Sequence, residues 1–138
     1  MIFYEVKVNY TRQTGEDNPG KVREAYLVES INCSNAESRT IEFIEPYIFG
    51  DLETPQIKKR QFFEILPLSG AEYWYEGKVE LITIEDSGEE KRHTVNILVQ
   101  ANGFTDALTR FKDVMNGYDC EIIGLKKSAI IEVLRNEK

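Results

Sequence analysis

The sequence has few of the residues from which metal sites and nucleophilic active sites are built. It contains two cysteines, Cys33 and Cys120, and a single histidine, His93. The cysteines form no Cys-x-x-Cys pair, so a zinc site would need an unusual set of ligands. A Gly-x-Ser-x-Gly motif and a glycine-rich phosphate loop are also missing. We therefore expect a protein that is not an enzyme, with no catalytic residue, no bound metal and no cofactor.

Long apolar runs and an excess of positive charge are missing as well. No apolar segment approaches the roughly 20 residues that a membrane-spanning helix needs, and the sequence opens on a strand pattern instead of a signal peptide. The formal net charge is -7, which repels phosphate backbones and argues against a nucleic-acid partner. These features predict a cytoplasmic protein without a membrane partner.

Aromatic and β-branched residues are plentiful. The 138 residues include seven Tyr, seven Phe and one Trp, and 41% of the chain is hydrophobic, which is enough for a real core. Strand-forming residues dominate, although two segments have the apolar spacing of a helix. The composition predicts an α+β fold.

An internal repeat is the strongest feature that is present. The segment Phe-Tyr-Glu-Val-Lys-Val at 3–8 returns as Trp-Tyr-Glu-Gly-Lys-Val at 74–79. A shift of 71 residues aligns 3–47 with 74–118 without a gap, and a shift of 68 then aligns 58–66 with 126–134. We predict one domain, 1–138, in which repeats 1–66 and 73–138 are joined by 67–72 and share a core around an approximate two-fold axis.

Each repeat has the pattern of a β-β-α-β unit. Apolar residues alternate with polar ones in the first strand of each copy, and turn-forming residues then lead into a second, antiparallel strand. Ser34 and Thr105 are the expected helix caps, and Pro46 and Gly117 the expected stops. A third strand, at about 57–66 and 120–134, ends each copy. The expected architecture is two pseudo-symmetric repeats of antiparallel strands packed with two helices.

Several short motifs carry a resemblance to a known family. They are Tyr4-Glu5-x-Lys7-Val8, Tyr26-Leu27-Val28, Ala36-Glu37, Trp74-Tyr75-Glu76-x-Lys78 and Leu98-Val99-Gln100-Ala101. Together they resemble an uncharacterised family of small proteins, a domain of unknown function, from Bacteroides-type bacteria, their phages and mobile elements. The resemblance implies a phage or mobile-element gene in a bacterial host, and it implies no chemistry.

Basic residues repeated in both copies are the first candidate binding site. Arg39 and Arg110 occupy the middle of the two expected helices, where they either cover the core with their stems or bind anions. The equivalent lysines, which would complete a site for a cyclic or linear dinucleotide, are Lys58, Lys59, Lys126 and Lys127. Exposed lysines also protect strand edges from pairing, which is the simpler reading of the four.

Two further candidates lie in the repeated first strands. Glu5 with Lys7, and Glu76 with Lys78, lie on the strand face opposite the expected buried tyrosines. They form either a solvated face with ion pairs or part of a binding site. Trp74 is expected in the core, and the alternative is an exposed stacking platform.

The leading functional hypothesis is a non-enzymatic binding protein of a phage or mobile element. Its acidic surface suits contact with a basic face of a host or viral protein, and a host-directed version would inhibit a defence system. The alternative is a sponge that sequesters a small anionic ligand, a nucleotide signal, in a site formed by the repeats or between subunits. Exposed sheet edges make a homodimer a further expectation.

Overall fold

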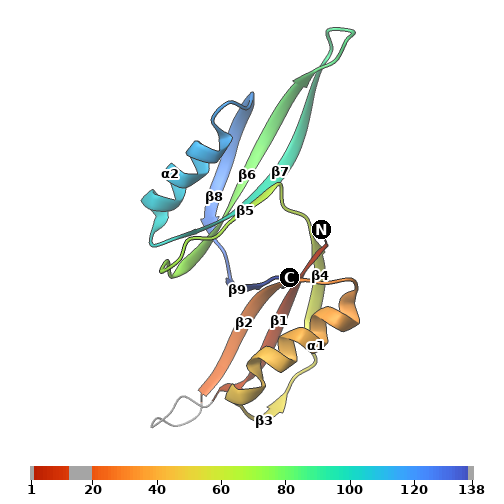
Figure 1. Cartoon of the computed structure of the whole chain (residues 1–138), viewed down its shortest axis with the longest axis vertical. Coiled ribbons are helices and arrows are strands. Elements are labelled where there is room, and N and C mark those ends of the chain that lie inside the picture. The colour runs from red at the N-terminus through yellow and green to blue at the C-terminus, as the bar shows by residue number, and fades with distance from the viewer. Residues whose placement is uncertain (1, 13–19, 137–138) are drawn as a thin grey trace. The chain divides into compact units, whose positions relative to one another are not determined.

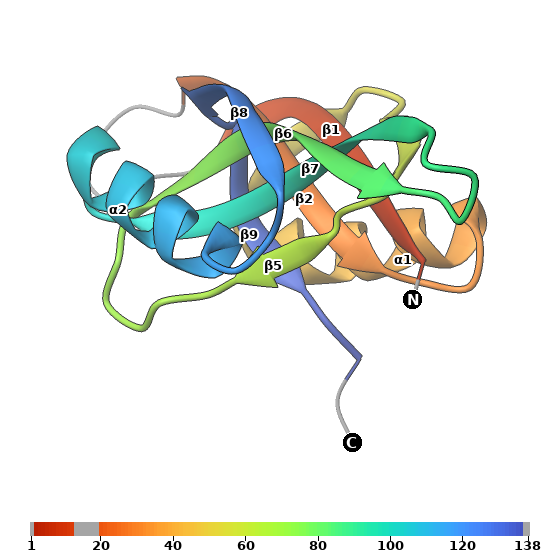
Figure 2. The ribbon, with the colours of Figure 1, turned by 90° about the horizontal axis from the view of Figure 1, so that it is seen from above.

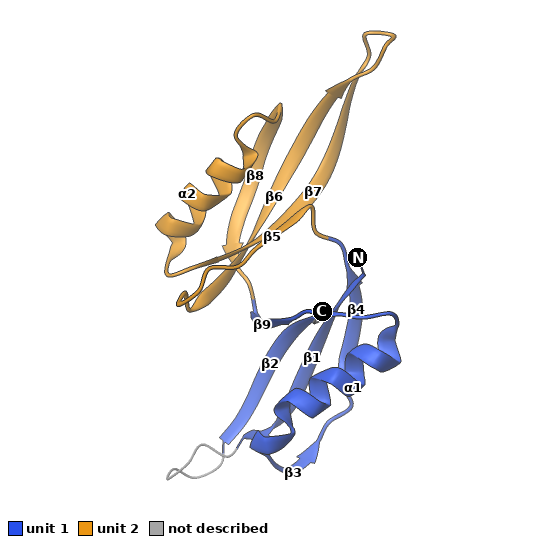
Figure 3. Ribbon diagram, in the orientation of Figure 1, with its two compact units in different colours: residues 1–61, 129–138 blue, residues 62–128 orange. Residues whose placement is uncertain are grey.

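The chain forms two compact units, each built from one sheet and one helix (Figure 3). The computed structural model describes residues 2–12 and 20–136. Unit 1 comprises residues 1–61 and 129–138, and unit 2 comprises the contiguous segment 62–128. Strands make up most of both units, so the predicted α+β class is confirmed.

Unit 1 is a sheet with a helix on one face. The sheet has the order β3-β1-β2-β9, and β4 pairs with β1 as well. β1 and β2 form the predicted antiparallel hairpin, whereas β9 joins the free edge of β2 in parallel. The elements are β1 (Phe3–Arg12), β2 (Gly20–Glu29), α1 (Cys33–Ile44), the 3-10 helix η1 (Glu45–Tyr47), β3 (Ile48–Leu52), β4 (Gln56–Arg60) and β9 (Ile130–Leu134).

Unit 2 has a four-stranded sheet of order β5-β7-β6-β8. β6 pairs antiparallel with β7 and with β8, and β5 joins the outer edge of β7 in parallel. The elements are β5 (Glu64–Leu66), β6 (Tyr73–Ile84), β7 (Glu90–Ala101), α2 (Phe104–Met115) and β8 (Cys120–Lys127).

Each helix covers one face of its own sheet (Figures 1 and 2). In unit 1 the inward residues of β1 alternate as predicted and pack with Ala36 and Ile44 of α1. In unit 2 the ring of Phe111 from α2 lies against Gly77 of β6, where a side chain would find no room. Its neighbours in that core are Val79, Ile97, Val99 and Met115.

The predicted third strands are wrong in one respect. Each divides into two strands that join different sheets. The first becomes β4, which pairs with β1 in unit 1, and β5, which pairs with β7 in unit 2. The second becomes β8, which pairs with β6 in unit 2, and β9, which pairs with β2 in unit 1. The breaks fall at residues 61–63 and 128–129. The β5 and β9 pairings are parallel, so the expectation of antiparallel strands throughout is also corrected.

The helix caps differ from the prediction. Asn32, not Ser34, caps α1, and its side chain accepts a hydrogen bond from the main-chain N–H of Asn35. Gly103 is the N-cap of α2 and supplies no side-chain cap, so Thr105 lies inside the helix. Asn32 can take the cap position in place of Ser34 because an amide oxygen caps a helix as well as a hydroxyl oxygen does.

The compact units do not follow the boundaries of the predicted repeats. Residues 62–66 belong to unit 2 and residues 129–138 to unit 1, because β5 and β9 are hydrogen-bonded there. A shared core between the two repeats stays a prediction. Within the described ranges, neither α1 nor α2 is long and apolar enough to span a membrane.

Candidate functional site

Arg39 lies where α1 meets the end of β9, and its guanidinium binds the main chain. Nη1 donates to the carbonyl oxygen of Glu29 and, at 2.9 Å, to Oδ1 of Asn136. Nη2 donates to the carbonyl oxygen of Arg135 at 3.0 Å. The carboxylate of Glu29 accepts the N–H of Asn136 at 2.9 Å. Arg39 and Glu29 therefore hold the two residues that follow β9.

Unit 2 contains a corresponding arrangement at the end of β5. Nη2 of Arg110 donates to the carbonyl oxygen of Pro67 at 3.3 Å. Oε1 of Gln100 accepts the N–H of Leu68 at 2.9 Å, and its Nε2 donates to the carbonyl oxygen of Ala71 at 3.0 Å. Arg110 and Gln100 therefore bind Pro67 and Leu68, the two residues after β5. Arg39 and Glu29 bind the two residues after β9 in the same way.

The structure does not bring the arginines and lysines of one unit together. Lys58 and Lys59 are exposed on β4, at the edge of the unit 1 sheet opposite to β9 and Arg39. Three strand spacings separate these edges, which is about 14 Å. Lys126 and Lys127 are likewise exposed on β8, whereas Arg110 binds next to β5 at the other edge of that sheet. A shared cleft of these residues does not exist within either unit.

Glu5, in the first Glu-Lys motif, is buried and paired with basic residues. Glu5 is 8% exposed and forms ion pairs with Arg60 and, at 3.8 Å, with Lys7. It also lies opposite Lys58 in the β1–β4 register, as Glu76 lies opposite Lys126 in the β6–β8 register. The reading of Glu5 as a solvated residue is therefore corrected.

The remaining candidates in unit 2, which lie on β6, differ in their exposure. Lys78 is exposed and Glu76 half-buried. Trp74 is 4% exposed, which places it in the interior as the simpler interpretation predicted. Lys127 covers a different aromatic residue, since its Nζ lies 3.7 Å from the centre of the Tyr73 ring.

A polar cluster on the inward face of unit 1 was not predicted. Oε1 of Glu24 accepts hydrogen bonds from the hydroxyls of Tyr10 (2.6 Å) and Tyr26 (3.0 Å). Oε2 accepts one from Arg12 at 2.9 Å, and the Arg12 guanidinium lies 4.3 Å from the centre of the Tyr47 ring. One carboxylate thus satisfies three donors beneath the end of α1. The sequence could have indicated this cluster, because Glu24 alternates with Val22 and Tyr26 on the same face of β2.

The cluster keeps its tyrosines protonated. Burial, followed by the hydrogen bond to Glu24, raises the pKa of Tyr10 to about 12. Burial and the charge of Glu24 also raise the pKa of Tyr26. Burial lowers the pKa of Arg12, but the charge of Glu24 and the interactions with Tyr10 and Tyr26 together outweigh it, and the net shift is upward. The arrangement stabilises neutral phenols and a charged guanidinium, which suits a structural network.

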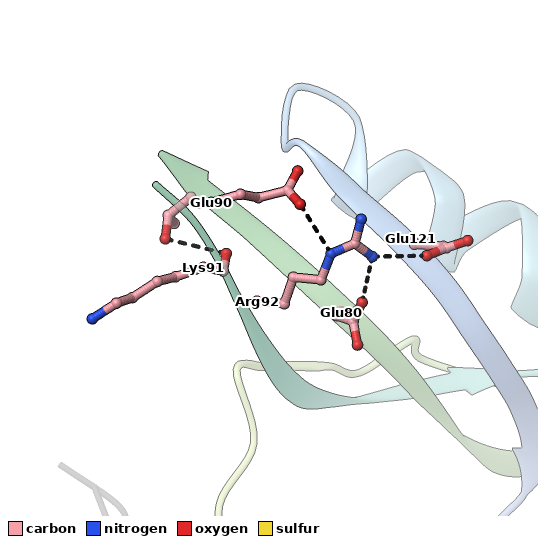
Figure 4. Close-up of polar contacts among 6 residues, drawn as sticks. Glu80, Glu90, Lys91, Arg92 and Glu121 are labelled. Carbon is pink, nitrogen blue, oxygen red and sulfur yellow. Dashed lines mark hydrogen bonds and ion pairs between the residues drawn. The ribbon is translucent and has the colours of Figure 1, made fainter. Parts of the chain in front are cut away.

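Arg92 lies at the centre of a second charged cluster, on the β6–β7–β8 sheet (Figure 4). Its Nη1 lies 2.6 Å from Glu80 and 3.2 Å from Glu121, and its Nε lies 3.4 Å from Glu90. Hydrogen bonding to Glu80 and the charge of Glu90 raise the pKa of Arg92. Three carboxylates from three strands surround one cation, so this exposed surface keeps a net negative charge. The described residues contain no group of three or more His, Cys, Asp or Glu side chains arranged to hold a metal.

Comparison with known proteins identifies a family and no function. The model of a family described as a domain of unknown function, DUF4494, matches residues 2–136. Neither the comparison with curated proteins nor that with solved structures gives a match.

Proposed function

Because the chain belongs to the DUF4494 family of unknown function, we propose from its geometry that it is a non-enzymatic binding protein. It comes from a phage or another mobile element of a Bacteroides-type host, and it acts by contact with a host or viral protein. In the host-directed form it inhibits a defence system. Two pseudo-symmetric β-β-α-β repeats provide the scaffold, and the β6–β7 hairpin is the contact surface.

The projection of the β6–β7 hairpin is the observation that carries this proposal. Both strands have 12 residues, about twice the common strand length. β8 pairs with β6 only between Tyr75 and Leu81, and β5 pairs with β7 only between Ile97 and Val99. The outer half of the hairpin therefore runs beyond its neighbours (Figure 1). Such an extension contributes little to the core and is available to a partner.

The chemistry of the hairpin supports a basic partner. Residues 80–96 contain five acidic side chains against two basic ones. Lys91 is paired with Glu85 at 2.8 Å, and Arg92 is held by glutamates, so the free charge is negative. Ile84 beside the turn is 70% exposed and offers an apolar contact within the acidic surface. Complementary charge steers encounter and gives specificity, while the apolar residue adds buried area.

Charge reversal on the hairpin turn tests the proposal. The wild-type protein is used to isolate a partner from host lysate, and binding of the purified partner is then measured by calorimetry at low and high salt. We expect Asp86→Lys with Glu89→Lys to weaken binding and to reduce its salt dependence. The matched control is Glu42→Lys with Glu53→Lys, two exposed acidic positions of unit 1. Equal loss in both variants, or no loss in either, contradicts a role for the hairpin.

A nucleotide sponge is the competing proposal. It is supported by a groove in unit 1 that Arg39, Phe43 and Arg135 line, since guanidinium groups and an aromatic ring suit a phosphate and a base. It is opposed by the hydrogen bonds that Arg39 already donates to main-chain oxygens. Calorimetry with a panel of nucleotides, and extraction of the purified protein, distinguish the two. An extractable nucleotide whose binding is lost in Arg39→Ala with Arg110→Ala would favour the sponge over protein contact.

A further inference from the structure

The edge of β2 in unit 1 is a built acceptor site for an extended strand. β9 pairs with it in parallel from Ala25 to Val28, with Leu27 opposite Val133 and Val28 opposite Leu134. The side chain of Leu134 packs against the apolar cluster beneath α1, and Ile130 is 2% exposed. The site therefore combines main-chain pairing with a pocket for one leucine, the usual basis of strand recognition.

The residues after β9 are recognised through the main chain. Arg39 binds the carbonyl oxygen of Arg135, and Glu29 binds the N–H of Asn136. Hydrogen bonds to charged groups are stronger than neutral ones. Main-chain contacts do not depend on which chain supplies the strand. Any segment that places a leucine in the pocket and continues for two residues satisfies the same main-chain donors and acceptors, and only the bond from Arg39 to the Asn136 amide depends on a side chain.

Unit 2 shows that this recognition pattern is not tied to one donor sequence. Its acceptor edge on β7 holds Glu64-Ile65-Leu66, where unit 1 holds Glu132-Val133-Leu134. Arg110 and Gln100 bind the two residues after Leu66 as Arg39 and Glu29 bind those after Leu134. The common elements are a glutamate, a β-branched residue and a leucine, followed by two residues that are held by their main chain.

The two acceptor sites differ in how their strand is attached. β5 is continuous in sequence with the unit that it completes, because unit 2 is the single segment 62–128. β9 reaches unit 1 only after the whole of unit 2, through Ser128 and Ala129. No covalent connection inside unit 1 ties β9 to the β2 edge. The strand at this site is therefore the one that a different molecule can supply without any change in unit 1.

We propose that the β2 edge accepts β9 from a second copy of this chain, which gives a strand-swapped dimer. The second copy is the occupant because its segment 130–136 is the one that the site is shown to fit. Exchange keeps the pairing of β9 with β2 and the bonds from Arg39 and Glu29, while it changes the course of the chain at 128–129 and costs the entropy of association. The ratio of dimer to monomer then rises with protein concentration, and exchange is slow because β9 must first detach.

Single cysteines on separate full-length chains test the exchange. One chain carries Leu27→Cys and the other Val133→Cys, both with Cys33→Ser and Cys120→Ser. The two are unfolded, refolded together at high concentration and oxidised. Because positions 27 and 133 are partners in the β2–β9 register, a swapped dimer yields a covalent heterodimer on a non-reducing gel. The control pairs Leu27→Cys with Ile84→Cys on the exposed hairpin. A heterodimer no more abundant than in the control overturns the proposal, and so does a dimer seen by light scattering without this disulfide.

A second measurement needs no substitution in the protein. The wild-type chain is refolded with an excess of a biotinylated peptide of residues 129–136. We expect the peptide to retain several times more protein on streptavidin than a peptide carrying Leu134→Asp. Equal retention by both peptides shows that the β2 edge does not accept the strand from another molecule. This result decides the question if either cysteine variant fails to fold, and it is independent of the hairpin and its partner.

Discussion

Gly77 and Phe111 predict a pair of substitutions that compensate each other. A Cβ atom at Gly77 would lie 2.1 Å from Cε2 and 2.5 Å from Cζ of the Phe111 ring. The ring is completely buried, so it cannot turn aside into water. The residues 71 positions earlier are Val6 and Thr40, both also completely buried. In unit 1, therefore, the strand residue is larger than Gly77 and the helix residue is smaller than Phe111.

The magnitudes follow from the volume of the side chains. Gly77→Val forces atoms into an occupied space and is expected to cost about 1–3 kcal/mol or more of unfolding free energy. Phe111→Thr removes most of a buried ring; Phe→Ala changes cost about 3–5 kcal/mol, and threonine refills a small part of that space. In the double variant the valine occupies space that the ring vacates. We expect a compensating coupling of at least about 2 kcal/mol between the two substitutions.

Urea unfolding of the wild type, both single variants and the double variant measures this coupling. Gly124→Ala is the matched control, because a Cβ atom at Gly124 meets no atom within 4 Å. It should change stability by no more than about 0.5 kcal/mol. Additive effects of Gly77→Val and Phe111→Thr would refute the reasoning, since they would mean that the valine does not use the space left by the ring.

Two further predictions concern the polar clusters. The phenol of an unfolded chain ionises near pH 10, whereas the pKa of Tyr10 is raised to about 12. The stability that Tyr10 contributes is therefore present below about pH 10 and falls by about 2–3 kcal/mol as the pH rises to 12. Chemical denaturation across this range should show the loss; Tyr10→Phe should make the fall less steep, and Tyr118→Phe, at an exposed tyrosine, should not. Arg39→Ala should lower the unfolding free energy by about 1–3 kcal/mol, because it removes the donor for two main-chain oxygens and one amide. Thermal unfolding should show a smaller loss for Arg110→Ala, whose bond to Pro67 is longer at 3.3 Å; an equal or larger loss for Arg110→Ala would contradict the assigned geometry.

The sequence drew attention to Arg39 and Arg110 but did not predict the atoms that they contact. The repetition of Arg39 and Arg110 at corresponding positions singled them out, and each does bind polar atoms. Their acceptors include the carbonyl oxygens of Arg135 and Pro67, which are 96 and 43 positions away in the chain. A carbonyl oxygen has no residue identity, so no pattern in the sequence points to it. An anionic ligand was the natural guess for a repeated arginine, since side-chain chemistry is all that a sequence displays.

The cluster around Glu24 illustrates the opposite case. Glu24 follows Val22 and precedes Tyr26 at the period of a strand, so an acidic residue on an inward face could have been recognised. Its three donors come from both strands of the hairpin, whose pairing was predicted correctly. The strand period places Glu24 on this face, but only the folded hairpin brings two phenols and a guanidinium to its carboxylate.

The sequence by itself determined the α+β class, the two hairpins and the positions of both helices, because these depend on the local alternation of apolar and polar residues and on turn chemistry. The tertiary structure alone decided that each expected third strand divides between the two sheets. In unit 1, β4 joins β1 and β9 joins β2; in unit 2, β8 joins β6 and β5 joins β7. Strand period records which face of a strand is buried. It does not record which edge the strand joins, because the pairing uses main-chain N–H and C=O groups that nearly every residue carries. The choice of edge depends on distant apolar pockets and on the arginines at their ends, which meet the strand only when the chain has folded.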